Sequence, residues 1–275
     1  MNKINFKLIF SLIFLIFVSF PIFTFSLLNF REGKINEINY QKFLQKEREA
    51  QEKIEKKNYL MGKFNPSTRE DFVLIPTEYT TDKSTMYLRK ETLDAFLKMH
   101  DAAAKDKIDL KIASATRNFN YQKDFWNKIW TGASLLNKEN LAKSILDNQK
   151  RFKKILEYVA VPGTSRHHFG TDIDLNGGNA SYFNSEVGKK EYAWLVKNAF
   201  LFGFCQPYNL KGEDRTTGYN EEKWHWSYFP LAKNFTQEYK NLVKDEDIKG
   251  FLGDENVAGK DLINNYVLDI NPDCF

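Results

Sequence analysis

The segment from Ser165 to Asp174, SRHHFGTDID, places the strictest demands on how this chain folds. It contains two of the four histidines, one glycine, and two aspartates separated by a single residue. Gly170 permits a sharp change of chain direction, because glycine reaches backbone conformations that other residues avoid. A loop can therefore present His167 while the strand that follows presents Asp174, and we expect the fold to be arranged around this turn.

A second segment, EKWHW, supplies another histidine, His225, three residues after Glu222. Zinc prefers imidazole nitrogen and carboxylate oxygen, and a catalytic zinc keeps one of its four positions open for water. We therefore predict that His167, Asp174 and His225 bind a zinc ion. Glu222 would act on the water bound to that ion, whose pKa falls to about 7. The spacing alone is a weak signal, because a histidine and an aspartate seven residues apart often occur by chance.

The N-terminus has the order of a secretory signal, with a short basic start and then an apolar run. Lys3 and Lys7 precede a stretch without charged residues that extends from Leu8 to Phe30. This stretch is also long enough to cross a bilayer as a helix, which takes about 20 apolar residues. We predict that residues 1–30 are a cleaved signal peptide or an uncleaved membrane anchor, and that the rest of the chain is exported.

Composition divides the rest of the chain into three parts. Residues 31–58 are rich in Glu, Lys and Gln, which predicts a charged helical linker. Residues 59–244 form the predicted catalytic domain, and residues 245–275 form a tail with enough apolar side chains to dock on it. The 24 Phe, 13 Tyr and 5 Trp allow a sizeable core. The small formal charge of +4 argues against a nucleic-acid partner, which usually requires a strongly basic face.

Periodicity and turn residues predict an irregular mixture of helices and short strands. We expect helices over residues 90–105, 138–158 and 186–200, another helix that carries Trp126 and Trp130, and strands over residues 109–115, 172–175, 204–208 and 224–229. Gly203 is expected to cap the helix that ends near residue 200. Because the strands do not alternate regularly with helices, the sequence predicts an α+β fold with a small antiparallel sheet packed with helices.

Three motifs resemble those of the zinc D-Ala-D-Ala carboxypeptidases of the VanY type. The pattern S-x-H-x-x-G-x-x-x-D is matched by Ser165, His167, Gly170 and Asp174. The pattern E-x-W-H-x-x-Y is matched by Glu222, Trp224, His225 and Tyr228. An upstream R-x4-Q is matched by Arg117 and Gln122, so the motifs follow the expected order across residues 80–230.

The resemblance implies a fold that is shared with the Hedgehog signalling domain and some lysins, with residues 59–244 as the metallopeptidase domain. It implies zinc ligation by His167, Asp174 and His225, with Glu222 as general base. Among the remaining motif residues, Arg117 is implied to steady the oxyanion or the substrate's carbonyl, and Ser165 and Gln122 to help hold the terminal carboxylate.

The expected function is therefore that of an exported zinc carboxypeptidase, which removes a terminal D-alanine from peptidoglycan stem peptides in the periplasm or cell envelope. The N-terminal segment could hold it at the inner membrane. The motifs do not separate D,D- from L,D-carboxypeptidases. Two alternatives remain open: an endopeptidase that cuts cross-links, and a non-catalytic module that binds the cell wall or a partner on the same scaffold.

Asp172 departs from the family pattern, which commonly has alanine at this position. In a strand, Asp172 and Asp174 share a face, so Asp172 could orient a metal ligand or replace Asp174 as one. The run from Asp172 to Gly177 also opens like a calcium-binding loop, but the twelfth position of that loop is Phe183 where a glutamate is needed. The adjacent His168 is expected to have a structural or supporting role.

The two cysteines are Cys205 and Cys274. In an exported chain they could form a disulfide that ties the tail to the domain. Equally, Cys205 could be a buried apolar residue and Cys274 could lie in a frayed end.

Overall fold

The computed structural model describes residues 6–275, with side chains from residue 29 onward. The chain forms two compact units, one that ends at Ile54 and one over Glu55–Phe275. Residues 31–58, predicted as a charged helical linker, belong to helix α1 (Phe6–Leu60). The predicted signal peptide or anchor at residues 1–30 lies almost wholly outside the part whose side chains are described. Within the residues that were described, no helix has the length and apolar character needed to cross a membrane.

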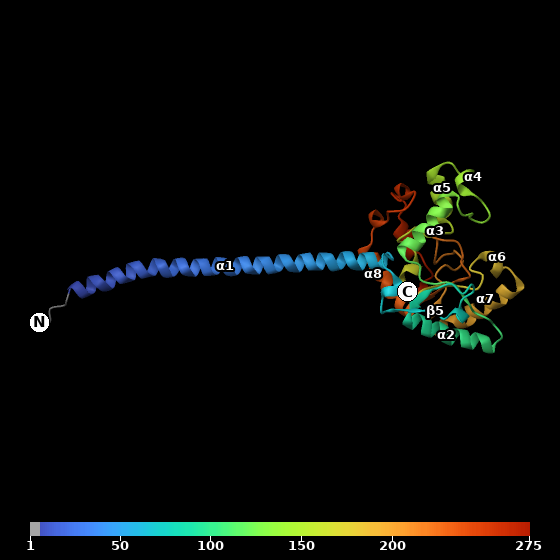
Figure 1. Ribbon diagram of the computed structural model, residues 1–275, viewed down its shortest axis with the longest axis horizontal. Helices are drawn as coiled ribbons and strands as arrows, with labels where there is room; N and C mark the ends of the chain where they lie inside the picture. Colours follow the sequence, from blue (N-terminus) through green and yellow to red (C-terminus); the bar gives the residue numbers. More distant parts are fainter. Residues whose placement is uncertain (1–5) are drawn as a thin grey trace. The chain divides into compact units, whose positions relative to one another are not determined.

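The unit from Glu55 onward mixes helices with short strands (Figure 1). Its strands are β1 (Phe72–Leu74), β2 (Tyr87–Arg89), β3 (Ile112–Ser114), β4 (Asp172–Leu175), β5 (Phe204–Cys205) and β6 (His225–Tyr228). Its helices are α2 (Lys90–Lys105), α3 (Phe119–Thr131), α4 (Leu141–Ser144), α5 (Asn148–Leu156), α6 (Ala180–Phe183), α7 (Glu186–Asn198) and α8 (Phe229–Leu242).

The central sheet has the strand order β3-β4-β6-β5, and each neighbouring pair is antiparallel. β1 and β2 form a separate antiparallel pair. The α+β class with a small antiparallel sheet, predicted from the sequence, is therefore confirmed. β4 and β6 lie in the middle of the sheet, so each is hydrogen-bonded to a neighbouring strand along both of its edges. This pairing fixes the direction in which their side chains project.

The two faces of β4 carry different kinds of side chain. Ile173 and Leu175 point into an apolar cluster with Phe96 and Met99 of α2 and Leu195 of α7. Burying such side chains stabilises the fold by roughly 1.5–3 kcal/mol each. The alternation of side chains along a strand turns Asp172 and Asp174 to the opposite face. The sheet is therefore anchored through its apolar face and presents its acids on the other.

The predicted helix over residues 138–158 is wrong, because the chain forms two shorter helices there, α4 and α5. The side chain of Asn140 accepts a hydrogen bond from the Lys143 amide, and that of Asp147 accepts one from the Lys150 amide. Both side chains thus cap helix N-termini, a role in which they are much more favourable than inside a helix. The break between the helices leaves Leu146 81% exposed.

The other predicted elements are present, some of them shorter than expected. α2 and β4 have the predicted bounds. β3 and β5 are shorter than the predicted strands over 109–115 and 204–208. α7 ends at Asn198, a short 3-10 turn follows, and Gly203 caps it with a φ of 81° as predicted.

The tail after residue 244 packs into the apolar core of the same unit. Ile248, Leu262, Val267 and Ile270 are buried in a cluster that also contains Trp126. Cys274 forms a disulfide with Cys205 of β5. Of the two possibilities that the sequence left open, the disulfide that ties the tail to the domain is therefore the one found.

Candidate metal centre

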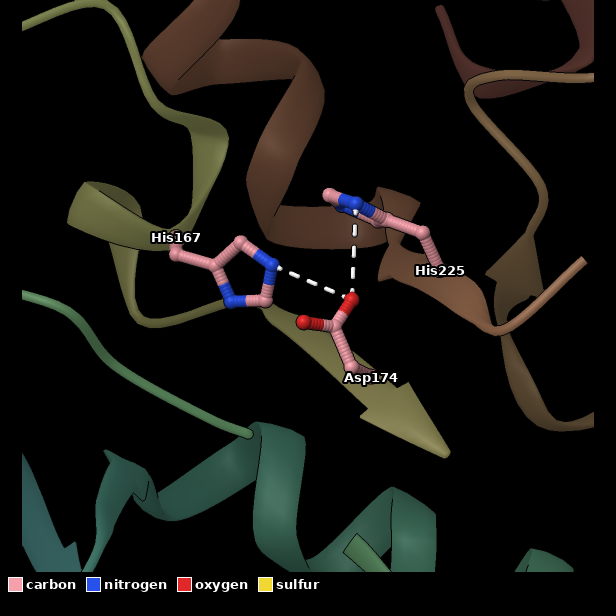
Figure 2. A group of neighbouring side chains, drawn as sticks. All are labelled: His167, Asp174 and His225. Carbon is pink, nitrogen blue, oxygen red and sulfur yellow. Dashed lines mark ion pairs between the residues drawn. The ribbon is translucent and has the colours of Figure 1, made fainter. Parts of the chain in front are cut away.

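Three separate segments bring their side chains together on the face of β4 that carries Asp172 and Asp174, opposite its apolar face (Figure 2). His167 lies in a short 3-10 turn over Arg166–Phe169, Asp174 lies on β4, and His225 begins β6. Gly170 ends the turn with a φ of 72°, and a Cβ atom there would collide with the Phe72 ring. Glycine is therefore required between the turn that carries His167 and the strand that carries Asp174.

The three donors are spaced as ligands of one ion would be. His167 Nε2 lies 3.3 Å and His225 Nδ1 lies 3.7 Å from the same oxygen, Asp174 Oδ1. One ligand atom from each residue falls within 4.8 Å of the others. In a tetrahedral zinc site with ligands at about 2.0–2.1 Å, neighbouring ligand atoms are about 3.4 Å apart. The donor set and its spacing thus fit a zinc ion.

His167 is oriented by the backbone. Its Nδ1 lies 2.7 Å from the carbonyl oxygen of Ala115, which can only accept, so Nδ1 carries the proton. Nε2 is thereby left with its lone pair toward Asp174. Both His167 Nε2 and Asp174 Oδ1 are buried and have no hydrogen-bond partner among the described residues. Burial and the nearby Arg117 guanidinium lower the pKa of His167, which favours the neutral form that a metal requires.

His225 lies between two carboxylates. Nε2 is 2.9 Å from Asp172 Oδ2, and Nδ1 is 3.0 Å from Glu222 Oε2. Burial alone would lower the pKa of His225, but these two hydrogen bonds raise it to about 9. Nδ1 is the nitrogen that faces both Glu222 and Asp174 Oδ1.

Glu222 reaches the site through a turn. The His225 amide donates to the Glu222 carbonyl at 3.2 Å, which brings the two side chains to the same side. The carboxylate is largely enclosed, and burial raises the pKa of Glu222 above its usual value. A carboxyl group with a raised pKa beside a metal position is well suited to exchange a proton near neutral pH.

Asp172 is absent from the group of donors that face one another. It accepts hydrogen bonds from Arg166, Ser227, Thr171 and His225. Burial would raise the pKa of Asp172, but the charge of Arg166 and the bond from His225 hold it well below its usual range. The segment from Asp172 is a buried strand, so the structure gives no support to the calcium-loop alternative.

Arg117, Ser165 and Gln122 occupy different positions around the centre. Arg117 Nη2 lies 3.2 Å from Asp174 Oδ2, the oxygen that does not face the histidines. Arg117 and Ser165 line a small hollow of about 40 Å³ beside His167 and His225. Gln122 is completely buried and does not line it; its side-chain amide donates to the carbonyl of Ala160, which does.

A larger cleft of about 460 Å³ extends from the metal position, and Arg117, Asp174 and Glu222 form part of its wall. Exposed aromatic side chains, among them Tyr121 and Tyr158, lie along it. This volume lies within the range of about 300–1,000 Å³ that is usual for ligand-binding clefts.

Sequence reasoning missed four residues around the centre. The rings of Tyr208 and His225 pack nearly perpendicular to each other, with centroids 4.9 Å apart, and Tyr219 lines the same hollow. Arg166 and Ser227 hold the Asp172 carboxylate. Ser227 could have been found by its place in the strand, since it follows His225 by two residues and shares its face. No local signal marks the others.

Comparison with known proteins gives the chain its relatives. The family profile described as VanY, D-alanyl-D-alanine carboxypeptidase, matches residues 85–231. The putative carboxypeptidase YodJ of Bacillus subtilis is 30% identical over 182 residues, which are 64% of this chain and 58% of that protein. A D-alanyl-D-alanine carboxypeptidase of Enterococcus faecalis is 34% identical over 91 residues, 32% of this chain and 31% of that protein. The matched part thus spans a third to somewhat over half of these two relatives.

Two solved structures are similar to the chain at lower sequence identity than these relatives. The LdcB LD-carboxypeptidase is 27% identical with a TM-score of 0.45, over 64% of this chain and 79% of that one. A vancomycin-resistance D,D-pentapeptidase VanY variant, solved in complex with Zn(II), is 24% identical with a TM-score of 0.43, over 67% and 93% of the two chains.

Proposed function

The chain belongs to the D-alanyl-D-alanine carboxypeptidase family of the VanY type, and on this premise we propose that it is a zinc-dependent carboxypeptidase. Its substrates are peptidoglycan stem peptides, from which it removes the terminal D-amino acid. The observation that carries the proposal is the meeting of His167 Nε2, Asp174 Oδ1 and His225 Nδ1 at ligand spacing, with Glu222 in contact with one of them.

A zinc ion bound by these three donors would acidify a water molecule and polarise the scissile carbonyl. Glu222 accepts the proton of the attacking water as the new C–O bond forms. It then passes this proton to the leaving amino group as the C–N bond breaks. Its raised pKa suits both steps, because the carboxyl group must first accept and then release a proton.

Arg117 is proposed to stabilise the negative charge that develops on the carbonyl oxygen. It lies beside Asp174 and lines both the small hollow and the larger cleft, so it can reach a peptide in either. Ser165 lines the hollow, where a hydroxyl donor can bind the terminal carboxylate of the peptide. Gln122 contributes through the Ala160 carbonyl that it holds.

The protein is proposed to act outside the cytoplasm, in the periplasm or cell envelope. Peptidoglycan is found there, and the Cys205–Cys274 disulfide is of the kind that persists in oxidising compartments. In this proposal residues 1–30 direct export and can retain the enzyme at the inner membrane, while residues 59–244 and the docked tail perform the chemistry.

The test uses the purified full chain with stem tetrapeptides, stem pentapeptides and cross-linked dimers, each with and without a chelator. We expect release of D-alanine from a stem peptide, its loss on chelation, and its recovery when zinc is added back. The preferred peptide separates D,D- from L,D-specificity. Cleavage of dimers alone would indicate an endopeptidase, and binding without any cleavage would indicate a non-catalytic wall-binding module.

A further inference from the structure

Asp172 lies diagonally across the sheet from His225. In the pairing of β4 with β6, Asp174 is opposite His225 and Asp172 is opposite Ser227. Diagonal neighbours on one face of an antiparallel pair are within reach of long side chains. A single imidazole can therefore contact the first acid of the D-x-D sequence through one nitrogen and face the second through the other.

We propose that Asp172 is a positioning residue for the metal centre: it holds the Nε2 proton of His225 and thereby turns the lone pair of Nδ1 toward the ion. The inference rests on the proposed metal site, but not on which peptide the protein cuts. The 2.9 Å contact from Nε2 to Asp172 Oδ2 fixes both the ring orientation and the tautomer, since a carboxylate can only accept this hydrogen bond.

The hydrogen bonds of Asp172 account for all of its acceptor capacity. Oδ1 accepts from Thr171 Oγ1 at 2.7 Å and from Ser227 Oγ at 2.8 Å. Oδ2 accepts from Arg166 Nε at 3.1 Å and from His225 Nε2. A carboxylate offers about four acceptor sites, so Asp172 has none left for a metal ion. In contrast, Asp174 Oδ1 accepts no hydrogen bond from the described part of the chain and faces the two histidines, so Asp174 is the acid available as a ligand.

Arg166 makes the arrangement rigid and balances its charge. Its side chain and that of Asp172 are fully buried, and it also donates to Ser227 Oγ and to Thr236 Oγ1 of α8, both at 2.9 Å. The network therefore joins the turn before β4, the two central strands and one helix. His225 is held against a scaffold that does not depend on the ion.

The experiment compares zinc affinity of the metal-free full chain across matched variants, by competition with a chromophoric chelator. Asp172→Asn and Asp172→Ala are expected to weaken zinc binding about 10–100-fold, as is typical for loss of a partner that orients a ligand. Thr171→Val removes one hydrogen bond to Asp172 without touching His225, and is expected to change the affinity less than about 3-fold.

A double variant, Arg166→Met with Asp172→Ala, separates positioning from a purely structural role. It removes both members of the buried ion pair, so no uncompensated charge remains to unfold the protein. We expect it to keep the weakened zinc affinity of Asp172→Ala. Recovery of wild-type affinity in the double variant would show that Asp172 merely neutralises Arg166, and would overturn the proposal.

Nitrogen NMR of histidine-labelled, zinc-loaded wild-type protein gives an independent reading that needs no variant to fold. We expect His225 to bind zinc through Nδ1 and to carry a slowly exchanging proton on Nε2. Zinc on Nε2, or an Nε2 proton that exchanges freely with water, would contradict the proposal. Neither result depends on peptide cleavage, so failure of the proposed reaction would be recognised separately by the absence of D-alanine release.

Discussion

Asp174 and His225 are register partners on the neighbouring strands β4 and β6, and their facing atoms, Oδ1 and Nδ1, lie 3.7 Å apart. Directly opposite residues of an antiparallel pair project from the same face of the sheet. Strand pairing therefore positions two of the three proposed ligands, Asp174 and His225. The turn before Gly170 supplies the third, His167 (Figure 2).

Replacing Glu222 tests whether the base is separate from the metal donors. Glu222→Gln keeps the shape of the side chain but cannot accept a proton, so we expect D-alanine release to fall about 10²–10⁴-fold. Zinc content, measured by atomic emission, should stay near one ion per chain. Glu186→Gln is the matched control, because Glu186 is an exposed residue of α7 that pairs with Lys189 and lines neither the hollow nor the cleft, so the rate should stay nearly unchanged. Loss of zinc from Glu222→Gln would instead place Glu222 among the ligands.

His168 supports Arg117 from behind. Its Nδ1 donates to the Arg117 carbonyl at 2.5 Å, and its Nε2 accepts from the Gly163 amide at 3.0 Å. His168→Phe leaves both backbone groups buried without partners, which should lower the free energy of unfolding by about 2–4 kcal/mol. We also expect KM for stem peptides to rise, because Arg117 shifts.

Urea unfolding and steady-state kinetics check both effects of the His168 substitution. His100→Phe is the control, since His100 packs edge-on against Tyr79, away from the centre, and should cost less than about 1 kcal/mol. Unchanged stability in His168→Phe would mean that its two hydrogen bonds contribute nothing.

The disulfide between Cys205 and Cys274 closes a loop over 69 positions of the sequence. The chain-entropy relation for a loop of this length gives a stabilisation of about 4 kcal/mol. The paired Cys205→Ala and Cys274→Ala variant should therefore unfold at clearly lower urea concentration. Wild-type protein with reductant should approach the variant, and coincident curves for oxidised protein and variant would refute a stabilising role.

The ion pairs of Asp71 lead us to expect that the stability of the fold decreases at acid pH. Burial would raise the pKa of Asp71, but hydrogen bonds with Tyr59 and Arg69 and the charge of Arg89 lower it. The resulting stabilisation is complete above the unfolded-state pKa of about 3.9 and is lost as the pH falls through the lower folded-state value. Arg89 in turn donates to the carbonyl of Phe169 at 2.6 Å, the last residue of the turn that contains His167.

Asp71→Asn should accordingly lower the unfolding free energy by about 1–2 kcal/mol at pH 7. The difference from wild type should shrink below about pH 4, where the unfolded wild-type carboxyl is itself protonated. Urea unfolding at pH 7 and pH 3 measures this directly. An equal difference at both pH values would show that the charge of Asp71 is not responsible.

Much of the architecture could be predicted because local patterns determine it. Leu93, Phe96 and Met99 repeat at helical spacing, and the helix has the predicted bounds. The prediction of one helix over residues 138–158 was wrong because its polar residues were interpreted as the exposed face of a continuous helix. Asn140 and Asp147 instead cap new helix starts there, a position that Asn and Asp favour over the interior of a helix.

The partners of the centre depended on contacts between distant segments. The sequence left Asp172 either as a support or as a substitute ligand, because alternation along a strand gives its face but not its partner. Its contact with His225 requires the register of β4 against β6, which no residue in either strand reveals alone. Arg166 and Thr236 meet only because α8 packs against the turn.

Diffraction from crystals of the zinc-loaded protein, with data on both sides of the zinc absorption edge, locates the ion and identifies its ligands. We expect one anomalous peak per chain, within about 2.0–2.2 Å of His167 Nε2, Asp174 Oδ1 and His225 Nδ1. A peak bound by Asp172, a peak that lacks either histidine, or no peak at this position would contradict the proposed zinc site.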